Sequence, residues 1–205
     1  MNKIISKIGI NVITEIFLSD NSKLEYTKFQ NEPNTSIHFS GLGILQNKNS
    51  YIPISYDGKE GIESLFEELA IHGWEKIYEN SKVVALKKNR QSITLEPGGQ
   101  IELSGAPLRN IHSACKETNE HLNLLKKIGQ KLNITLLGLG SRPLEKTNDI
   151  KIMPKSRYQI MKEYMPKKGK HGLDMMLSTC TVQANLDFSS ETDMIKKTLL
   201  AVKIQ

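Results

Sequence analysis

The chain has 205 residues, of which 38% are hydrophobic and 24% are charged, and its mean hydropathy is −0.38. These values are typical of a soluble globular protein and exclude an intrinsically disordered chain. No stretch approaches the about 18 consecutive apolar residues of a transmembrane helix, and no small-residue cleavage site follows the first residues, so neither a membrane partner nor a signal peptide is expected.

The net charge of +6 results from 28 basic residues interleaved with 22 acidic ones. Because the sequence has neither a basic helix nor alternating aromatic and basic residues, we expect no nucleic-acid partner. Small anionic ligands, such as a nucleotide or an amino-acid carboxylate, explain the excess equally well. The cysteines Cys115 and Cys180 form no zinc-binding pair. They predict a reducing compartment, the cytoplasm.

The first 48 residues show little periodicity, and only weak strands are expected at 7–17 and 35–45. The turn signal Asp57-Gly58 then precedes an amphipathic helix at 59–72, which Gly73 ends. Short strand-like runs with turn residues between them predict an antiparallel meander, with strands at 74–78, 83–87, 92–96 and 100–103.

The second half of the chain alternates helices and strands. Apolar residues at spacings of three and four predict a long helix at 108–132, and residues 134–143 predict a buried strand with a Gly-rich end. A helix framed by Pro154 and Pro166 follows. The stretch STCTVQANLDF predicts a strand with one apolar face, and a last amphipathic helix has N-cap candidates in Ser189 and Ser190.

Two carboxylates, Glu96 and Glu102, flank the turn PGGQ inside strand-like sequence. A loop of residues 98–100 would place Glu96 opposite Glu102, whereas a loop of residues 98–99 would place Glu96 opposite Ile101. Opposed carboxylates about 5 Å apart repel each other unless a cation joins them, and Mg²⁺ carrying an ATP phosphate is a natural candidate. From the spacing alone, two solvated carboxylates on an exposed hairpin are the commoner case.

Two further groups of residues could bind a ligand. Arg157, near the start of a helix, could bind a carboxylate or phosphate through its forked guanidinium, although Arg157 and Lys155 taken alone are more often surface residues. A row of polar side chains along one strand could bind a polar ligand or a metal, or could simply face solvent: Thr181, Gln183, Asn185 and Asp187. The five scattered histidines are expected to be structural or exposed.

Several stretches together closely resemble the plant and proteobacterial type of glutamate–cysteine ligase. They are SITLEPGGQIELSGAPL, NIHSACKETNEHL, MPKSRYQIMKEYMPK and GLDMMLSTCTVQANLDFSSETDMIKK. The resemblance covers about residues 50–205. It predicts a poorly matched segment at 1–48, followed by the N-terminal half of a ligase catalytic domain at 49–205.

The resemblance implies an enzyme that uses ATP to join the γ-carboxylate of glutamate to the amine of cysteine through an acyl phosphate, the first step of glutathione biosynthesis. It also implies an α+β fold similar to the catalytic domain of glutamine synthetase, in which a curved, mostly antiparallel sheet forms a funnel with helices outside. Glutamates on the strands of this funnel hold Mg²⁺. Phosphoryl transfer needs charge neutralisation and alignment, which such a site supplies.

The same resemblance assigns roles to individual residues. Glu96 and Glu102 become the catalytic, metal-binding carboxylates, and Arg157 becomes a substrate-binding arginine. Gln183 and Asn185 lie on the strand that lines the substrate pocket. Cys115 matches a helix cysteine that in many relatives forms a redox-sensitive disulfide with a cysteine in the second half of the chain.

The sequence also departs from the family pattern. Relatives carry a strand similar to IGTEHEKF with further metal-binding glutamates. The equivalent stretch in this sequence is HFSGLGILQNKN, and no acidic residue occurs between Glu32 and Asp57. Relatives are also longer. We therefore expect an incomplete funnel and a fragment with little or no activity alone. A non-catalytic nucleotide-binding remnant and a ligase of the same superfamily with another acceptor amine are the alternatives.

Overall fold

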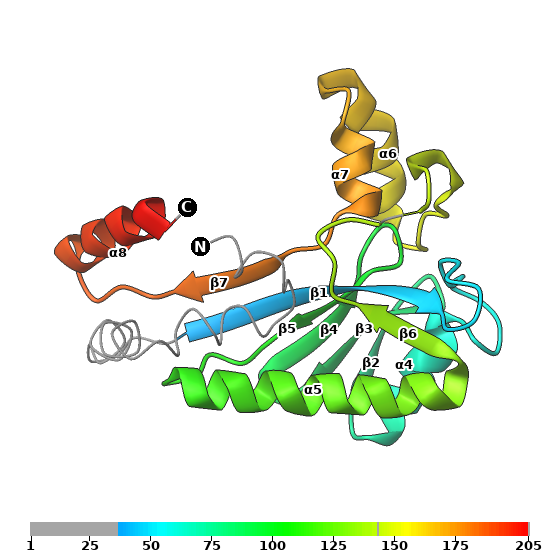
Figure 1. Cartoon of the computed structure of the whole chain (residues 1–205), viewed down its shortest axis with the longest axis horizontal. Coiled ribbons are helices and arrows are strands. Elements are labelled where there is room, and N and C mark those ends of the chain that lie inside the picture. The colour runs from blue at the N-terminus through cyan, green and yellow to red at the C-terminus, as the bar shows by residue number, and fades with distance from the viewer. Residues whose placement is uncertain (1–36, 143, 205) are drawn as a thin grey trace.

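The computed structural model describes residues 37–142 and 144–204 (Figure 1). The strand expected at 7–17 therefore lies outside the described residues. Within them, seven strands form one sheet in which every pair is antiparallel, and helices pack around it. This arrangement confirms a mixed α+β fold built on an antiparallel sheet.

The sheet has the order β2-β3-β4-β5-β1-β6, and β7 also pairs with β1. The bounds are β1 Ile37–Asn47, β2 Glu75–Glu79, β3 Lys82–Lys88, β4 Gln91–Leu95, β5 Ile101–Ser104, β6 Ile134–Leu137 and β7 Val182–Leu186. The expected meander is confirmed as β2 to β5. Asn80, Ser81 and Asn89 take positive φ at its turns, a conformation that asparagine tolerates.

Strand β1 joins the meander to the rest of the sheet. Its first half pairs with β5 on one side and with β7 on the other, so that Ser40 is a partner of both Ser104 and Gln183. Its second half pairs with β6. The division of the chain at residue 48 stays a prediction, although β1 lies before this boundary and is an integral part of the sheet.

The helices are α4 Ile62–Ile71, α5 Ile111–Leu132, the short 3₁₀ helix η1 Thr147–Asp149, α6 Ser156–Lys168, α7 Gly172–Ser178 and α8 Glu191–Ile204. Asn110 caps α5 by accepting a hydrogen bond from Ser113 N, which explains why this helix starts later than expected. Ser190 Oγ accepts from Asp193 N at the start of α8. Helix α6 continues past Pro166, where we expected it to end, and α7 was not expected.

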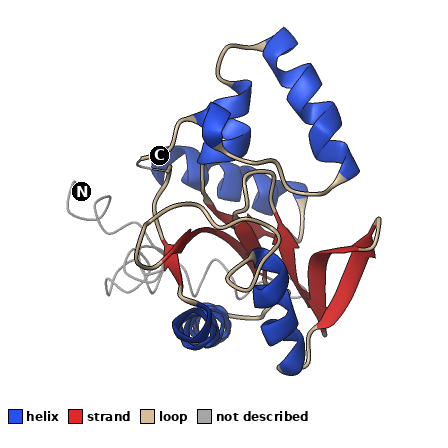
Figure 2. Cartoon of the chain, turned by 90° about the vertical axis from the view of Figure 1, so that its right-hand side faces the viewer, coloured by secondary structure: helices blue, strands red, loops and turns tan. Residues whose placement is uncertain are grey.

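The core lies between the sheet and two helices. Figures 1 and 2 show α4 and α5 on one side of the sheet and α6 and α7 on the other. Apolar side chains of α4 and α5 pack against the inward residues of the meander, among them Ile62, Leu65, Phe66, Leu69, Leu125, Ile128, Leu86, Ile93, Leu95, Ile101 and Leu103. Each such buried side chain contributes about 2 kcal/mol, so this face of the sheet is the stabilising one.

No described helix, in residues 37–142 or 144–204, is both long and apolar enough to cross a membrane.

Candidate active site

The β4–β5 hairpin has a register that differs from both alternatives considered from the sequence. Leu95 lies opposite Ile101, and Thr94 lies opposite Glu102. Glu96 N donates to Gln100 O at 2.8 Å, which leaves residues 97–99 as a three-residue loop. Gly99, with φ 83°, takes the left-handed position that such loops require. The loop therefore begins one residue earlier than either of the two loops considered from the sequence.

This register still places Glu96 and Glu102 on the same face of the sheet. Thr94 shares a face with its partner Glu102, and Glu96 follows Thr94 by two residues. Both carboxylates are half-buried. Thr94 Oγ1 donates to Glu96 Oε1 at 3.0 Å, and Ser104 Oγ lies 3.5 Å from Glu102 Oε1. The face is the one opposite α4 and α5.

Burial raises the pKa of Glu96, and the negative charge of Glu102 raises it further. The hydrogen bond from Thr94 and the positive charges of Lys155 and Arg157 act in the opposite direction. Two carboxylates and two cations therefore affect one another at the end of this hairpin. Such a mixed cluster is typical of a site that binds charged ligands.

Lys155 belongs to this cluster of charged groups, whereas from the sequence alone it was more often expected to be a surface residue. Its side chain is half-buried, and its Nζ donates to Leu95 O at 2.7 Å. Burial lowers the pKa of Lys155, and the charge of Glu96 partly offsets this effect. The only signal in the sequence was the MPKSRY stretch itself, because the partner carbonyl lies 60 residues away along the chain.

Arg157 lies beside this cluster on the first turn of α6. Its guanidinium carbon is 5.0 Å from the centroid of the Tyr158 ring, and its Nη2 donates to Tyr158 OH at 3.3 Å. Tyr158 is 1% exposed, and its hydroxyl donates to Leu95 O at 2.5 Å. The buried tyrosine therefore fixes the start of α6 to the hairpin and supports the exposed arginine.

Gln183 and Asn185 of β7 are exposed and lie on the same sheet face as Glu102. Ser104 of β5 and Gln183 of β7 flank Ser40 of β1, so the two strands are about 10 Å apart. Gln183 Nε2 donates to Asn185 Oδ1 at 2.8 Å. The structure thus brings the predicted residues to one face but does not bring those of β7 into contact with the carboxylates.

Cys115 lies on α5, across the sheet from these residues. It is half-buried and free, and its Sγ accepts from Asn119 Nδ2 at 3.4 Å. Cys180 is also free and is buried, and burial raises the pKa of its thiol to about 12. The redox role of Cys115 stays a prediction.

The carboxylate pair fits one kind of metal site. No cluster of three or more His, Cys, Asp or Glu side chains able to hold a metal occurs in the part of the chain that the structure describes. Mg²⁺ is commonly held by one or two protein carboxylates and takes its other ligands from phosphate oxygens and water. Glu96 and Glu102 therefore fit a Mg²⁺ that arrives with a phosphate, and they do not fit an all-protein metal cage.

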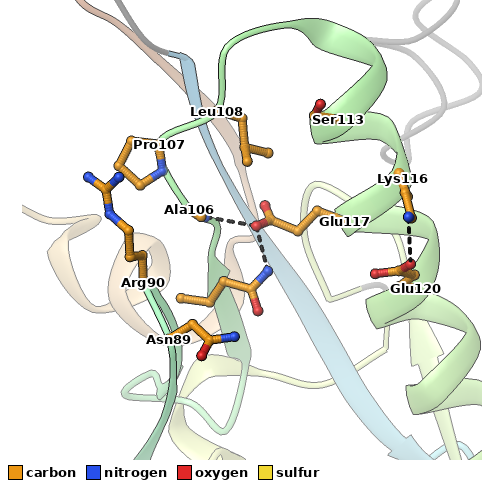
Figure 3. A pocket seen from close by; sticks show the side chains of 10 residues that line it. Asn89, Arg90, Ala106, Pro107, Leu108, Ser113, Lys116, Glu117 and Glu120 are labelled. Atoms are coloured by element: carbon orange, nitrogen blue, oxygen red, sulfur yellow. Dashed lines mark hydrogen bonds and ion pairs between the residues drawn. The ribbon is translucent and has the colours of Figure 1, made fainter.

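A cavity of about 380 Å³ lies elsewhere, between the β3–β4 turn and the first turns of α5 (Figure 3). At its floor, Glu117 Oε1 accepts from Gln91 Nε2 at 2.5 Å and from Ala106 N at 2.9 Å. None of the predicted site residues lines it. Glu117 ties α5 to the segment after β5, and we assign it a structural role.

Comparison with known proteins gives consistent matches. The model of glutamate-cysteine ligase family 2 matches residues 44–204. The chain is 50% identical over 161 residues to the chloroplastic glutamate–cysteine ligase of Arabidopsis thaliana, a match that covers 77% of this chain and 30% of the relative. It is 51% identical over 154 residues to the chloroplastic glutamate–cysteine ligase A of Oryza sativa subsp. japonica, covering 75% and 31% respectively.

These relatives also correct one prediction. They are chloroplastic enzymes, so the cytoplasmic location expected from the cysteine content is wrong. Two unpaired cysteines indicate a reducing environment but do not distinguish between compartments that share it. The chain spans about 30% of the length of the relatives that it matches. Since the family model matches well over half of the chain, the chain belongs to glutamate-cysteine ligase family 2.

Proposed function

We propose that the chain contributes the Mg²⁺–ATP-binding wall of a glutamate–cysteine ligase. The reaction is the ATP-dependent joining of the glutamate γ-carboxylate to the cysteine amine through an acyl phosphate, the first step of glutathione biosynthesis. The names of the relatives support this activity. The observation that carries the proposal is the placement of Glu96 and Glu102 on one sheet face with Lys155 beside them.

Each residue has a distinct task in this proposal. Glu96 and Glu102 hold the Mg²⁺, which when bound neutralises phosphate charge and aligns the γ-phosphate. One N–H of the Lys155 ammonium donates to Leu95 O, and the other two can donate to an anionic oxygen. Arg157 likewise has N–H donors besides the one that contacts Tyr158, and they can bind a substrate carboxylate.

Gln183 and Asn185 offer amide groups to the polar part of a substrate. In this proposal the substrate lies across β1, between β5 and β7. The same arrangement supports a funnel similar to that of glutamine synthetase, because α4 and α5 cover the outer face of the sheet and the proposed site residues occupy the inner face.

A second candidate is nucleotide binding without ligation. The small number of metal ligands favours this candidate. Among the described residues, no third Asp, Glu, His or Cys joins Glu96 and Glu102 to complete a metal site. Such a module would bind Mg²⁺–ATP and leave the phosphate untransferred.

Calorimetry and product analysis separate the candidates. The protein is titrated with ATP in the presence of Mg²⁺ or of a chelator, and ADP release is then measured with glutamate, with and without cysteine. The proposal expects Mg²⁺-dependent ATP binding, and ADP release that requires cysteine identifies the ligase. Binding without ADP release identifies the second candidate, and equal ATP binding with chelator refutes the metal site.

A further inference from the structure

Arg142 is a buried arginine that belongs to none of the roles described so far. It follows β6, and only 6% of its surface is exposed. Its Nη2 donates to Gly98 O at 2.6 Å, and its Nε lies 3.4 Å from Leu177 O at the end of α7. Glu145, which accepts a hydrogen bond from Gln46 of β1, supplies a nearby negative charge. The guanidinium therefore joins the hairpin loop to the end of α7.

Gln100 completes the same connection from the other side of the loop. It is 1% exposed, and its Oε1 accepts from Gly98 N at 2.9 Å. Its Nε2 donates to Thr179 O at 2.9 Å and to Leu177 O at 3.2 Å. Both backbone polar atoms of Gly98 are thus held by buried side chains. The backbones of Gly98 and Leu177 also lie so close that a Cβ on Gly98 would be 2.2 Å from Leu177 O.

The position of Glu96 depends on this loop more than on the sheet. Strand β4 ends at Leu95, so no strand-to-strand pairing holds Glu96 itself. Its N donates to Gln100 O, and its O accepts from Gly99 N at 3.0 Å. Glu102, in contrast, lies within β5 and is paired on both sides, with Thr94 and with Leu42.

We propose that Arg142 and Gln100 are positioning residues, which seat the loop of residues 97–99 on the end of α7 and thereby hold the Glu96 carboxylate on the Glu102 side of the hairpin. The assignment of a metal to this pair rests on the proposed function. The positioning of Glu96 does not, and the experiment measures the two separately.

The first measurement is the titration of the Glu96 carboxyl carbon by ¹³C NMR, assigned with Glu96→Gln. Arg142→Met keeps a flexible, unbranched side chain, although a shorter one, and removes its donors, whereas Arg142→Lys keeps a cationic donor group. A loosened loop lets water reach Glu96, so its pKa should fall in Arg142→Met and should fall less in Arg142→Lys. The Glu102 carboxyl chemical shift should stay unchanged in both variants.

Tyr56→Phe is the control for a general loss of stability. Tyr56 OH donates to Val83 O at 2.9 Å in the core beneath the meander, so this variant loses a buried hydrogen bond away from the loop. It should lower the midpoint of thermal unfolding without changing the Glu96 titration. If Arg142→Met and Arg142→Lys unfold at lower temperature while the titration of Glu96 is unchanged, Arg142 only stabilises the fold and the proposal is refuted.

The second measurement is Mg²⁺–ATP affinity by calorimetry. It should fall roughly tenfold in Arg142→Met, as for other residues that orient a metal ligand, and less in Arg142→Lys. Absence of binding by the unsubstituted protein would overturn the proposed function and leave the NMR test of positioning intact. Full affinity together with an unmoved Glu96 titration in Arg142→Met would overturn the positioning role instead.

Discussion

Glu96 lies diagonally across the β4–β5 hairpin from Glu102. The residue directly opposite Glu96 is Gln100, and the residue directly opposite Glu102 is Thr94. Diagonal positions across an antiparallel pair are roughly 7–8 Å apart, compared with about 5 Å for directly opposed residues. The repulsion between the carboxylates is therefore smaller than in direct opposition, and their longer side chains can still reach one cation. The diagonal arrangement is compatible with a protein that folds before the metal binds.

Neutralising either carboxylate should weaken the binding of Mg²⁺–ATP. Glu96→Gln and Glu102→Gln keep the size of the side chain and remove the charge that attracts a divalent cation. We expect a loss of affinity of roughly tenfold or more for each, measured by calorimetry. Glu120→Gln, on the exposed side of α5, is the matched control. Equal affinity in all three variants would exclude the pair as the metal site.

Removing the positive charge of Lys155 should change the protonation of Glu96. The charge of Lys155 lowers the pKa of Glu96, so Lys155→Met should raise it. The carboxylate would then be lost at a higher pH, and Mg²⁺ binding would weaken at mildly acidic pH first. A ¹³C titration of Glu96 checks this, with Lys162→Met on the exposed part of α6 as control. A pKa that stays constant would show that Lys155 does not act on Glu96.

His121 should make the protein less stable in acid. It is buried on α5, its Nδ1 has no hydrogen-bond partner among the described residues, and burial lowers its pKa from 6.5 to about 4. Between these values the unfolded chain binds a proton that the folded chain does not, so stability is full above pH 6.5 and falls as the pH drops toward 4. The loss is about 3 kcal/mol.

Urea unfolding at pH 7 and at pH 4.5 measures this effect. His121→Gln should lose less stability than the unsubstituted protein between the two values, because the titrating group is absent. The exposed His112→Gln should behave like the unsubstituted protein. The same acid loss in all three proteins would mean that other groups cause it.

The sequence correctly predicted those helices and strands whose signals lie within a single segment of the chain. Helix α5 has a long apolar stripe, a capping asparagine at its start and Asn133 in the left-handed conformation at its end, and all three signals lie within the segment itself. The meander was predictable for the same reason, since its short strand-like runs are separated by turns that contain residues with positive φ. The common face of Glu96 and Glu102 follows from strand periodicity only when the loop has three residues, because a two-residue loop would place the two carboxylates on opposite faces.

The remaining features depend on contacts that are distant in sequence. Two adjacent glycines allowed more than one loop, and the choice is consistent with Gly98 lying against Leu177, which leaves Gly99 the left-handed position. Lys155 looked like a surface residue because its acceptor belongs to β4. Pro166 did not end α6, because Gly169 N still reaches Met165 O at 3.1 Å and closes the last turn.

The close approach of Gly98 to α7 makes one substitution decisive. In Gly98→Ala the new Cβ would meet Leu177 O at 2.2 Å, and this oxygen belongs to the backbone, so either the loop or the end of α7 must move. We expect a loss of about 1–3 kcal/mol in the free energy of unfolding, measured in urea. The displaced loop should also lower the affinity for Mg²⁺–ATP, because Glu96 moves with it.

Gly140→Ala is the matched control for this substitution. Its Cβ would meet nothing within 4 Å, and its φ is not positive, so stability and affinity should both be retained. A Gly98→Ala protein as stable as Gly140→Ala would show that the loop is not seated on α7. A Gly98→Ala protein that is less stable but binds Mg²⁺–ATP normally would show that the seating of the loop and the orientation of Glu96 are independent.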